Sequence, residues 1–259
     1  MVIEIWSDIM CPFCYIGKRR LESALQSFTQ ADKIQIVWKS FLLNPDMVTD
    51  PSKSSLEYLS ENKGWSMAQT RQITQQVVAM AKEVGLEYDM ENTVVANAKR
   101  AHQVLQLAKS LGKGDAMKER FLKAYFTEGR NIDDTQTLIE LAGNVGVAED
   151  MVQNALATGE FAWKVEQDIH ESQVLGVRGV PFFVFDRKYA ISGAQPSTVF
   201  VAEDMVQNAL ATGEFAWKVE QDMVQNALAT REYRDWETDR KSTRLNSSHS
   251  AKSRMPSSA

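Results

Sequence analysis

The two cysteines of this chain stand three positions apart, in the segment Cys11-Pro12-Phe13-Cys14. Residues 2–6 before them are β-branched and aromatic and predict a strand, and residues 15–30 after them carry apolar side chains at helical intervals. Pro12 suits a first helical position, where no N–H is needed. A helix N-terminus stabilises negative charge through its free N–H groups and its dipole. We therefore expect Cys11 to lie exposed at the helix cap with an acidified thiol, and Cys14 one turn inside, close enough to form a disulfide.

The composition is that of an ordinary globular protein. The chain has 259 residues, 44% hydrophobic and 24% charged, and a formal net charge of -5. This mild acidity predicts no nucleic-acid partner and no anionic membrane surface, and no apolar run is long enough to span a membrane. The start of the sequence lacks the pattern of a secretory signal, so we expect a cytoplasmic protein. Two cysteines in such a chain favour a reactive pair over a structural disulfide framework.

The predicted elements are those of an α/β fold interrupted by helices. Residues 34–41 predict a second strand, so the cysteines stand at the first junction of a strand-helix-strand unit, where α/β folds place their chemistry. From Ser52 the apolar period becomes helical, and helices are predicted over residues 66–84, 94–111, 115–127, 134–144, 148–158 and 161–175. Asp133 and Asp134 offer an N-cap for the fourth of these helices.

After Gly176 the pattern returns to strands. Residues 182–185 and 189–192 predict a hairpin, hence an antiparallel pair. Val180 precedes Pro181 at the start of this hairpin and is expected to be extended. The sequence is compatible with a cis bond between the two residues.

The sequence after Phe200 repeats an earlier segment without change. Residues 201–222 are identical to residues 147–168, and residues 223–230 repeat part of that segment again. Natural repeats diverge on their solvent-exposed faces, so we interpret these copies as a recent duplication or an assembly error. Residues 231–259 end in RKSTRLNSSHSAKSRMPSSA, which resembles a peptide appended to many unrelated predicted proteins, of the kind that translated sequencing adapter yields. We expect this tail to be disordered and non-native.

Three segments together resemble a known family. WSDIMCPFCYIGKRR, GVRGVPFFVF and SGAQP are similar to motifs of the DsbA-like thioredoxin-fold oxidoreductases, in particular the cytoplasmic FrnE-like subfamily. The resemblance covers residues 1–200 and implies an α/β, thioredoxin-like fold with a large all-helical insertion. The domains expected from it are residues 1–47 and 175–200 for the two parts of the thioredoxin fold, 48–174 for the insertion, 201–230 for the duplicated copies and 231–259 for the tail.

The resemblance also implies the roles of the site residues. Cys11 would be the attacking thiol and Cys14 the resolving thiol, with Pro12 and Phe13 beside them and Val180-Pro181 as the cis-proline loop that docks the substrate. Exchange then passes through a mixed disulfide, which the second cysteine resolves. The expected partners are protein or small-molecule thiols and disulfides. No metal and no cofactor are implied, with glutathione as a candidate co-substrate.

Three alternatives remain open at this point. A C-x-x-C pair is also half of a structural zinc site, but His102, His170 and His249 are not spaced as the second pair that zinc needs. The glutathione-dependent 2-hydroxychromene-2-carboxylate isomerases are similar in fold and insertion, yet they typically carry serine where Cys11 stands. The third alternative is a non-catalytic, chaperone-like protein that binds partners through its helices. The retained cysteine pair favours disulfide exchange.

Other side chains near the motifs have ordinary structural interpretations. Asp8 either tunes the thiol or begins a turn. Arg178 either contacts an anionic substrate such as glutathione or is a surface arginine. We expect two tryptophans to pack in the core and four polar residues to face solvent: Trp6 and Trp38, then Lys18, Arg19, Arg20 and His170.

Overall fold

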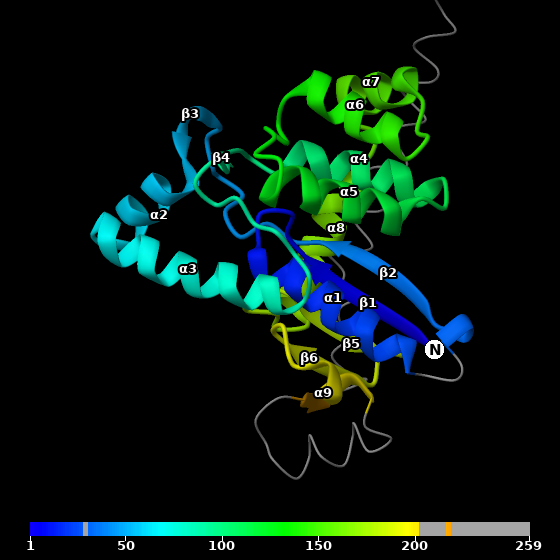
Figure 1. The fold of residues 1–259 in the computed structure, drawn as a ribbon. Coiled ribbons are helices and arrows are strands. Elements are labelled where there is room, and N and C mark those ends of the chain that lie inside the picture. The colour runs from blue at the N-terminus through cyan, green and yellow to red at the C-terminus, as the bar shows by residue number, and fades with distance from the viewer. Residues whose placement is uncertain (28–30, 202–215, 219–259) are drawn as a thin grey trace, which may run out of the picture.

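The computed structural model describes residues 1–27, 31–201 and 216–218. These residues contain a mixed five-stranded sheet with the strand order β2-β1-β5-β6-β7 (Figure 1). Strand β1 pairs in parallel with β2 and antiparallel with β5, and β5 and β6 form the predicted hairpin. The bounds of the strands are β1 (Val2–Ser7), β2 (Gln35–Ser40), β5 (Phe182–Phe185), β6 (Tyr189–Ser192) and β7 (Ala216–Lys218). The strand-helix-strand unit predicted from the sequence is therefore confirmed.

The helices fall into an inserted block and two helices that flank the sheet. Helix α1 (Pro12–Gln26) follows β1, and α9 (Ser197–Val201) packs beside α1 after the hairpin. The block between them contains α2 (Ser55–Lys63), α3 (Met67–Glu83), α4 (Lys99–Ser110), α5 (Gly114–Phe126), α6 (Thr135–Asn144), α7 (Glu149–Thr158) and α8 (Ala162–Val174). A short 3₁₀ turn, Ala31–Lys33, precedes β2. Figure 1 shows α4 to α7 gathered above the sheet and α2 and α3 projecting to one side.

The insertion is not entirely helical, which corrects the prediction. Strand β3 (Asp50–Ser54) pairs antiparallel with β4 (Val94–Val95) and forms a second, two-stranded sheet. The helix predicted to begin at Val94 begins instead at Lys99. The two adjacent valines are β-branched and favour an extended backbone, and β3 offers them a partner.

Local signals account for where several helices begin. Ser54 and Ser66 each cap a helix in a capping box. Each serine hydroxyl accepts a hydrogen bond from the amide of Glu57 or Gln69, and the side chain of that residue accepts one from the serine amide. Asp134 accepts a hydrogen bond of 2.8 Å from the Thr137 amide, so the N-cap predicted for α6 is confirmed. These caps fix the ends of helices that the apolar period only locates approximately.

The repeated sequence adopts two different structures in its described part. Residues 162–164 begin helix α8, whereas the identical residues 216–218 form β7 and pair with the edge of β6. Apart from Val201, which ends α9, the remaining residues of the copies and the tail lie outside the described residues. They include the apolar positions Met205, Leu210, Phe215 and Val219 of the copies.

Gly17 lets α1 lie directly against the Val180-Pro181 loop. A Cβ atom built on Gly17 would stand 2.9 Å from Pro181 Cγ and 3.3 Å from Phe183 Cζ. Both neighbours belong to the tightly packed base of the fold, where Phe183 is fully buried and Phe200 packs edge-on against it with ring centroids 5.0 Å apart. The absence of a side chain at position 17 is therefore what permits this close approach.

We expect Gly17→Ala to lower the free energy of unfolding by about 1–3 kcal/mol, because the rigid proline ring has to move away from the added methyl group. Gly143→Ala is the matched control, since Gly143 is exposed in α6 and nothing lies within 4 Å of the place that a Cβ atom would occupy there. That substitution should stabilise the protein by up to about 1 kcal/mol through helix propensity. Urea unfolding measures both changes, and equal effects at the two glycines would contradict the packing argument.

Candidate active site

Both cysteines lie at the start of α1, and both are buried. Cys11 is the N-cap residue and Cys14 lies within the first turn, where its amide donates a hydrogen bond of 3.0 Å to the Cys11 carbonyl. Their side chains are free thiols, with exposed fractions of 4% for Cys11 and 1% for Cys14. The expectation that Cys11 is exposed is therefore wrong. The loop that ends at Val180 covers it.

That loop makes a direct contact with the first thiol. Cys11 Sγ donates a hydrogen bond of 3.3 Å to the Val180 carbonyl oxygen, and the Val180–Pro181 peptide bond is cis. Pairing of β5 with β1 places the start of the hairpin beside the end of β1. Val180 is half-buried next to the thiol, and Pro181 is buried beneath it against Gly17.

The two thiols share their ionisation unequally. The Cys11 pKa is raised, because the neighbouring Cys14 thiol and burial both disfavour its charge. Burial also raises the pKa of Cys14, but the neighbouring Cys11 thiol, the positive charge of Lys118 and the Ser7 side chain outweigh it and lower this pKa. Burial and the neighbouring Cys14 thiol thus oppose the acidification of Cys11 that the helix N-terminus is expected to give.

Behind the thiols lies a buried group of charged and polar side chains. Asp8 accepts hydrogen bonds from the amides of Met10 (3.2 Å) and Leu43 (2.7 Å), and its carboxylate lies 3.5 Å from His102 Nε2. Lys118 donates a hydrogen bond of 3.1 Å to the Ser7 carbonyl. His102 comes from α4 and Lys118 from α5, and both are fully buried. The inserted helices thus complete the rear wall of the site.

The front of the site opens into a cavity of about 640 Å³. It is bounded by the start of α1, the α2–α3 hairpin and the loop at Gly179-Val180, and Cys11 lines it whereas Cys14 does not. Most of its walls are apolar, including Phe13 and Trp65, and Lys63 is the one charged side chain among the described residues that line it. Tyr88 fixes the lip of the cavity by donating a hydrogen bond of 2.7 Å to the Pro12 carbonyl.

The remaining sequence-predicted residues are placed as follows. Trp6 and Trp38 are buried in the core, as expected. Arg178 and His170 are exposed, and neither lines the cavity. Lys18 is buried, which corrects its assignment to a solvated face, because Glu22, Asp115 and Glu119 surround its ammonium group. No group of three potential ligands that could hold a metal ion occurs in the described part of the chain.

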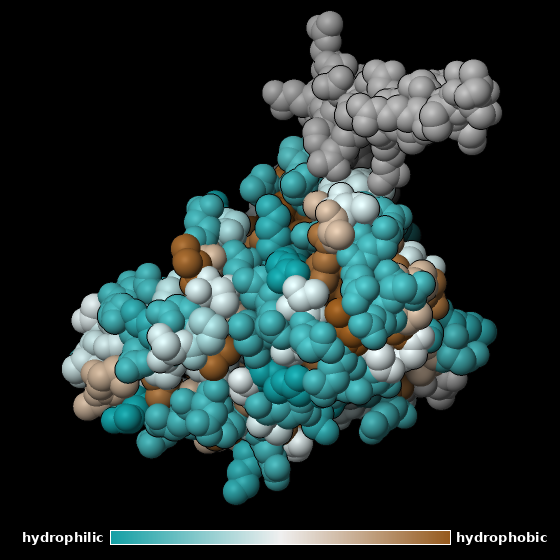
Figure 2. Space-filling view, turned by 90° about the horizontal axis from the view of Figure 1, so that it is seen from above, coloured by the Kyte–Doolittle hydropathy of each residue, from teal (hydrophilic) through white to brown (hydrophobic). Residues whose placement is uncertain are grey.

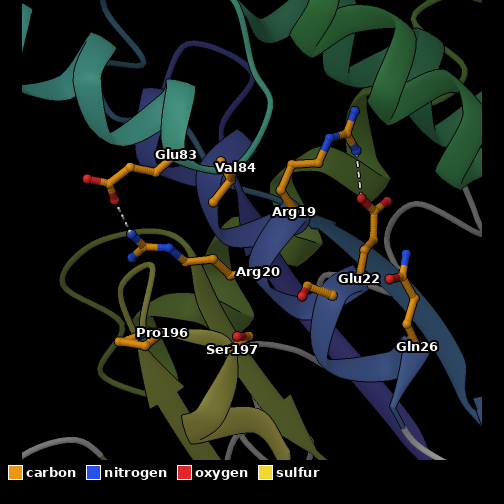
Figure 3. Close-up of a pocket in the computed structure, with 9 residues that line it drawn as sticks. Arg19, Arg20, Glu22, Gln26, Glu83, Val84, Pro196 and Ser197 are labelled. Atoms are coloured by element: carbon orange, nitrogen blue, oxygen red, sulfur yellow. Dashed lines mark hydrogen bonds and ion pairs between the residues drawn. The ribbon is translucent and has the colours of Figure 1, made fainter.

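A second cavity, of about 480 Å³, lies between α1, the end of α3 and the start of α9 (Figure 3). Its two arginines already have partners: Arg19 pairs with Glu22 and Glu119, and Arg20 reaches the Ala194 carbonyl and Glu83. Neither thiol lines this second cavity.

The space-filling view in Figure 2 shows a largely hydrophilic face with scattered apolar residues and no continuous apolar patch.

Sequence reasoning missed His102, Lys118 and Tyr88. A signal for the first two exists in the helical period. Lys118 stands three and four positions before the buried Phe121 and Leu122, and His102 stands four positions after the buried Ala98. A polar residue on an apolar helix face points inward, and only the fold shows that His102 meets Asp8 and that Lys118 meets Ser7 behind the thiols. Tyr88 lies outside any regular element and left no such signal.

We expect Asp8→Asn to destabilise the protein at pH 7 by about 1–3 kcal/mol, because an amide cannot accept both backbone hydrogen bonds as the carboxylate does. Burial raises the pKa of Asp8, but His102 and the two amides more than offset it, so the pKa is lowered in the folded protein. The carboxylate therefore contributes stability above its unfolded pKa of about 4, and this contribution is lost as the pH falls through the lower folded value.

The difference between the two proteins should accordingly be largest at neutral pH and narrow below about pH 4. Urea unfolding between pH 7 and pH 3 measures it. Asp134→Asn serves as the control, since asparagine caps a helix about as well as aspartate. A constant difference at every pH would show that the charge of Asp8 contributes nothing.

The chain matches a family model over most of its length. The model is the DSBA-like thioredoxin domain, and it matches residues 2–203. The chain is similar to the uncharacterized protein YwbO of Bacillus subtilis, at 28% identity over 206 residues that cover 76% of this chain and 92% of YwbO. It also resembles a probable DsbA oxidoreductase, SCO1869 of Streptomyces coelicolor, at 36% identity and a TM-score of 0.74, over 83% of this chain and 91% of that one.

Two more distant likenesses concern the fold alone. The cytosolic disulfide reductase DsbM of Pseudomonas aeruginosa, solved with GSH, matches at 17% identity and a TM-score of 0.53, over 82% of this chain and 98% of that one. A 2-hydroxychromene-2-carboxylate isomerase matches at 16% identity and a TM-score of 0.56, over the same 82% and 98%. The extent of the family match and the likeness to SCO1869 identify the relationship. This chain belongs to the DSBA-like thioredoxin domain family.

Proposed function

We propose that this protein is a thiol–disulfide oxidoreductase that exchanges disulfides through Cys11 and Cys14. The observation that carries the proposal is the contact of Cys11 Sγ with the Val180 carbonyl, 3.3 Å away at the mouth of the cavity. A substrate sulfur that enters the cavity meets Cys11 first. Extended substrate backbone next to it meets Val180, whose carbonyl is already turned toward the thiol.

The roles of the two cysteines in the exchange follow from which of them lines the cavity. Cys11 lines the cavity and Cys14 does not, so Cys11 forms the mixed disulfide and Cys14 resolves it from behind. The two thiols titrate as a pair, and transfer of one proton from Cys11 to Cys14 places the thiolate on the accessible sulfur. Attack then breaks the substrate disulfide and releases one half of it as a thiolate.

The substrate fits a disulfide flanked by apolar or aromatic groups, in a peptide or a small molecule. The walls of the cavity are mostly apolar and offer one cation, Lys63. Pro12, Phe13 and Val180 line it, and Pro181 supports the loop from below. Glutathione remains a candidate co-substrate, and the fold shared with DsbM, which was solved with GSH, supports testing it.

A cytoplasmic location is part of the same proposal. None of the helices in residues 1–27 and 31–201 is long and apolar enough to cross a membrane. DsbM, which shares the fold, is a cytosolic protein. A reducing compartment would keep the pair as the free thiols seen here.

We expect Cys11→Ser to abolish reduction of a dithiol-coupled peptide disulfide, because no accessible sulfur then remains. Cys14→Ala should still attack once and accumulate the mixed disulfide on Cys11, which mass spectrometry detects. The same preparations are assayed for isomerisation of 2-hydroxychromene-2-carboxylate with glutathione. Disulfide turnover at the wild-type rate in Cys11→Ser would disprove the proposal. Isomerase turnover in a variant that lacks both cysteines would favour the isomerase instead.

We expect Trp65→Ala to raise KM about 5–30-fold for a disulfide peptide with aromatic neighbours, with little effect on a small polar disulfide. Trp65 lines the cavity and is 36% exposed, so it has apolar surface left for a substrate to cover. Met151→Ala is the control, because Met151 has a similar exposure on α7 and does not line the cavity. Equal KM changes in the two variants would contradict this use of the cavity.

A further inference from the structure

Lys118 is a buried lysine that the exchange mechanism has not yet used. It lies on α5 in the inserted block, and its side chain is fully buried. In the described part of the chain its Nζ donates one hydrogen bond, of 3.1 Å, to the Ser7 carbonyl, and it lies 5.5 Å from the centre of the Trp38 ring. Burial of an ammonium group with so few acceptors is costly unless a negative charge lies nearby.

Among the negative charges that act on Lys118, that of Cys14 has the largest effect. Ser7 ends β1, and its carbonyl holds Lys118 while its hydroxyl lies against the Cys14 sulfur. That hydroxyl is buried and has no regular hydrogen-bond partner among the described residues. One residue of β1 thus brings the lysine to the side of the thiol pair that faces away from the cavity.

We propose that Lys118 is the buried counter-charge that stabilises the Cys14 thiolate, so that an inserted helix contributes to the reactivity of the resolving thiol. The inference deepens the proposed function and rests on it for its role in turnover. Lys118 acts through Cys14 and is a positioning residue. It does not touch the substrate.

The step that it assists is resolution of the mixed disulfide. Cys14 gives up its proton to the Lys118 amine or, where Lys118 already carries its proton, to solvent. In both cases an ammonium group stands beside a thiolate. The Cys14 sulfur then attacks Cys11 Sγ, the Cys11–Cys14 disulfide forms, and the bond from Cys11 to the substrate sulfur breaks. The substrate leaves as a thiolate and takes a proton from water, having gained the two electrons that the cysteine pair lost.

The surroundings of Lys118 suit this exchange. Burial lowers its pKa to about 8, although the negative charges of Cys14, Asp8 and Cys11 oppose that change, and Lys109 on α4 lowers it slightly further. His102 also faces the site from α4, and its own pKa is lowered, chiefly by burial, so it stays neutral near pH 7. Because its pKa of about 8 lies near neutral pH, Lys118 gains or loses a proton at little cost in free energy.

A comparison with Lys18 shows why burial alone is insufficient. Lys18 is as deeply buried, on the same helix as the thiols, but Glu22, Asp115 and Glu119 already neutralise its charge. These partners raise its pKa in spite of burial. Lys118 has no carboxylate within ion-pair distance in the described part of the chain, so its charge is available to the sulfur.

The test measures Cys14 directly. In a Cys11→Ser background Cys14 is the single thiol of the chain, and its ultraviolet thiolate absorbance is followed against pH. Lys118→Met should raise the Cys14 pKa by about one unit or more. Lys118→Gln, which keeps a donor for the Ser7 carbonyl, should do the same, and Lys118→Arg should restore the low value. Lys18→Met is the control and should leave the Cys14 pKa unchanged.

A second readout uses the pair with both cysteines present. When Lys118→Met is equilibrated with a glutathione buffer, the equilibrium should shift from the dithiol toward the Cys11–Cys14 disulfide. The equilibrium constant should change tenfold for each unit by which the Cys14 pKa rises, which corresponds to about 30 mV in reduction potential. An unchanged Cys14 pKa in folded Lys118→Met and Lys118→Gln would overturn the proposal. The titration requires no turnover, so it remains readable if Cys11→Ser disproves the proposed function.

Discussion

The contact between α1 and the Val180-Pro181 loop is the constraint on which the site depends. Antiparallel pairing of β1 and β5 brings together a thiol and a carbonyl 169 positions apart in the sequence. That approach requires a helix without a side chain at position 17, since any Cβ there would collide with the proline ring. Strand pairing, a glycine and a loop thus act together. Weakening any of them would open the thiol to water without altering a reactive atom.

The inserted helices add buried polar groups to those at the end of β1. Lys118 on α5 donates a hydrogen bond to the Ser7 carbonyl, and His102 on α4 lies 3.5 Å from the carboxylate of Asp8, which follows β1. Burying such groups costs free energy that a hydrophobic replacement would avoid. The insertion therefore forms part of the site as well as the wall of the cavity.

The local sequence pattern was sufficient to predict the C-x-x-C pair at a helix start, the strand before it and the hairpin at residues 182–192. Asp134 caps its helix as its residue type predicts. Burial of Cys11 could not be predicted, because the covering loop is distant in sequence. Nor does local sequence decide every element. Ala-Trp-Lys is helical at residues 162–164 and extended at 216–218, where the edge of β6 offers unpaired backbone groups. An available strand partner there outweighs the helical preference of the segment.

The two thiols of the site differ both in their access to the cavity and in the direction of their pKa shifts. Cys11 lines the cavity and has a raised pKa, whereas Cys14 lies behind it and has a lowered pKa. An apolar substrate that fills the cavity excludes water and strengthens every charge interaction behind it. In the proposed exchange, occupation of the cavity and formation of the thiolate would thus be linked, because Cys11 lines the cavity and lies next to Cys14.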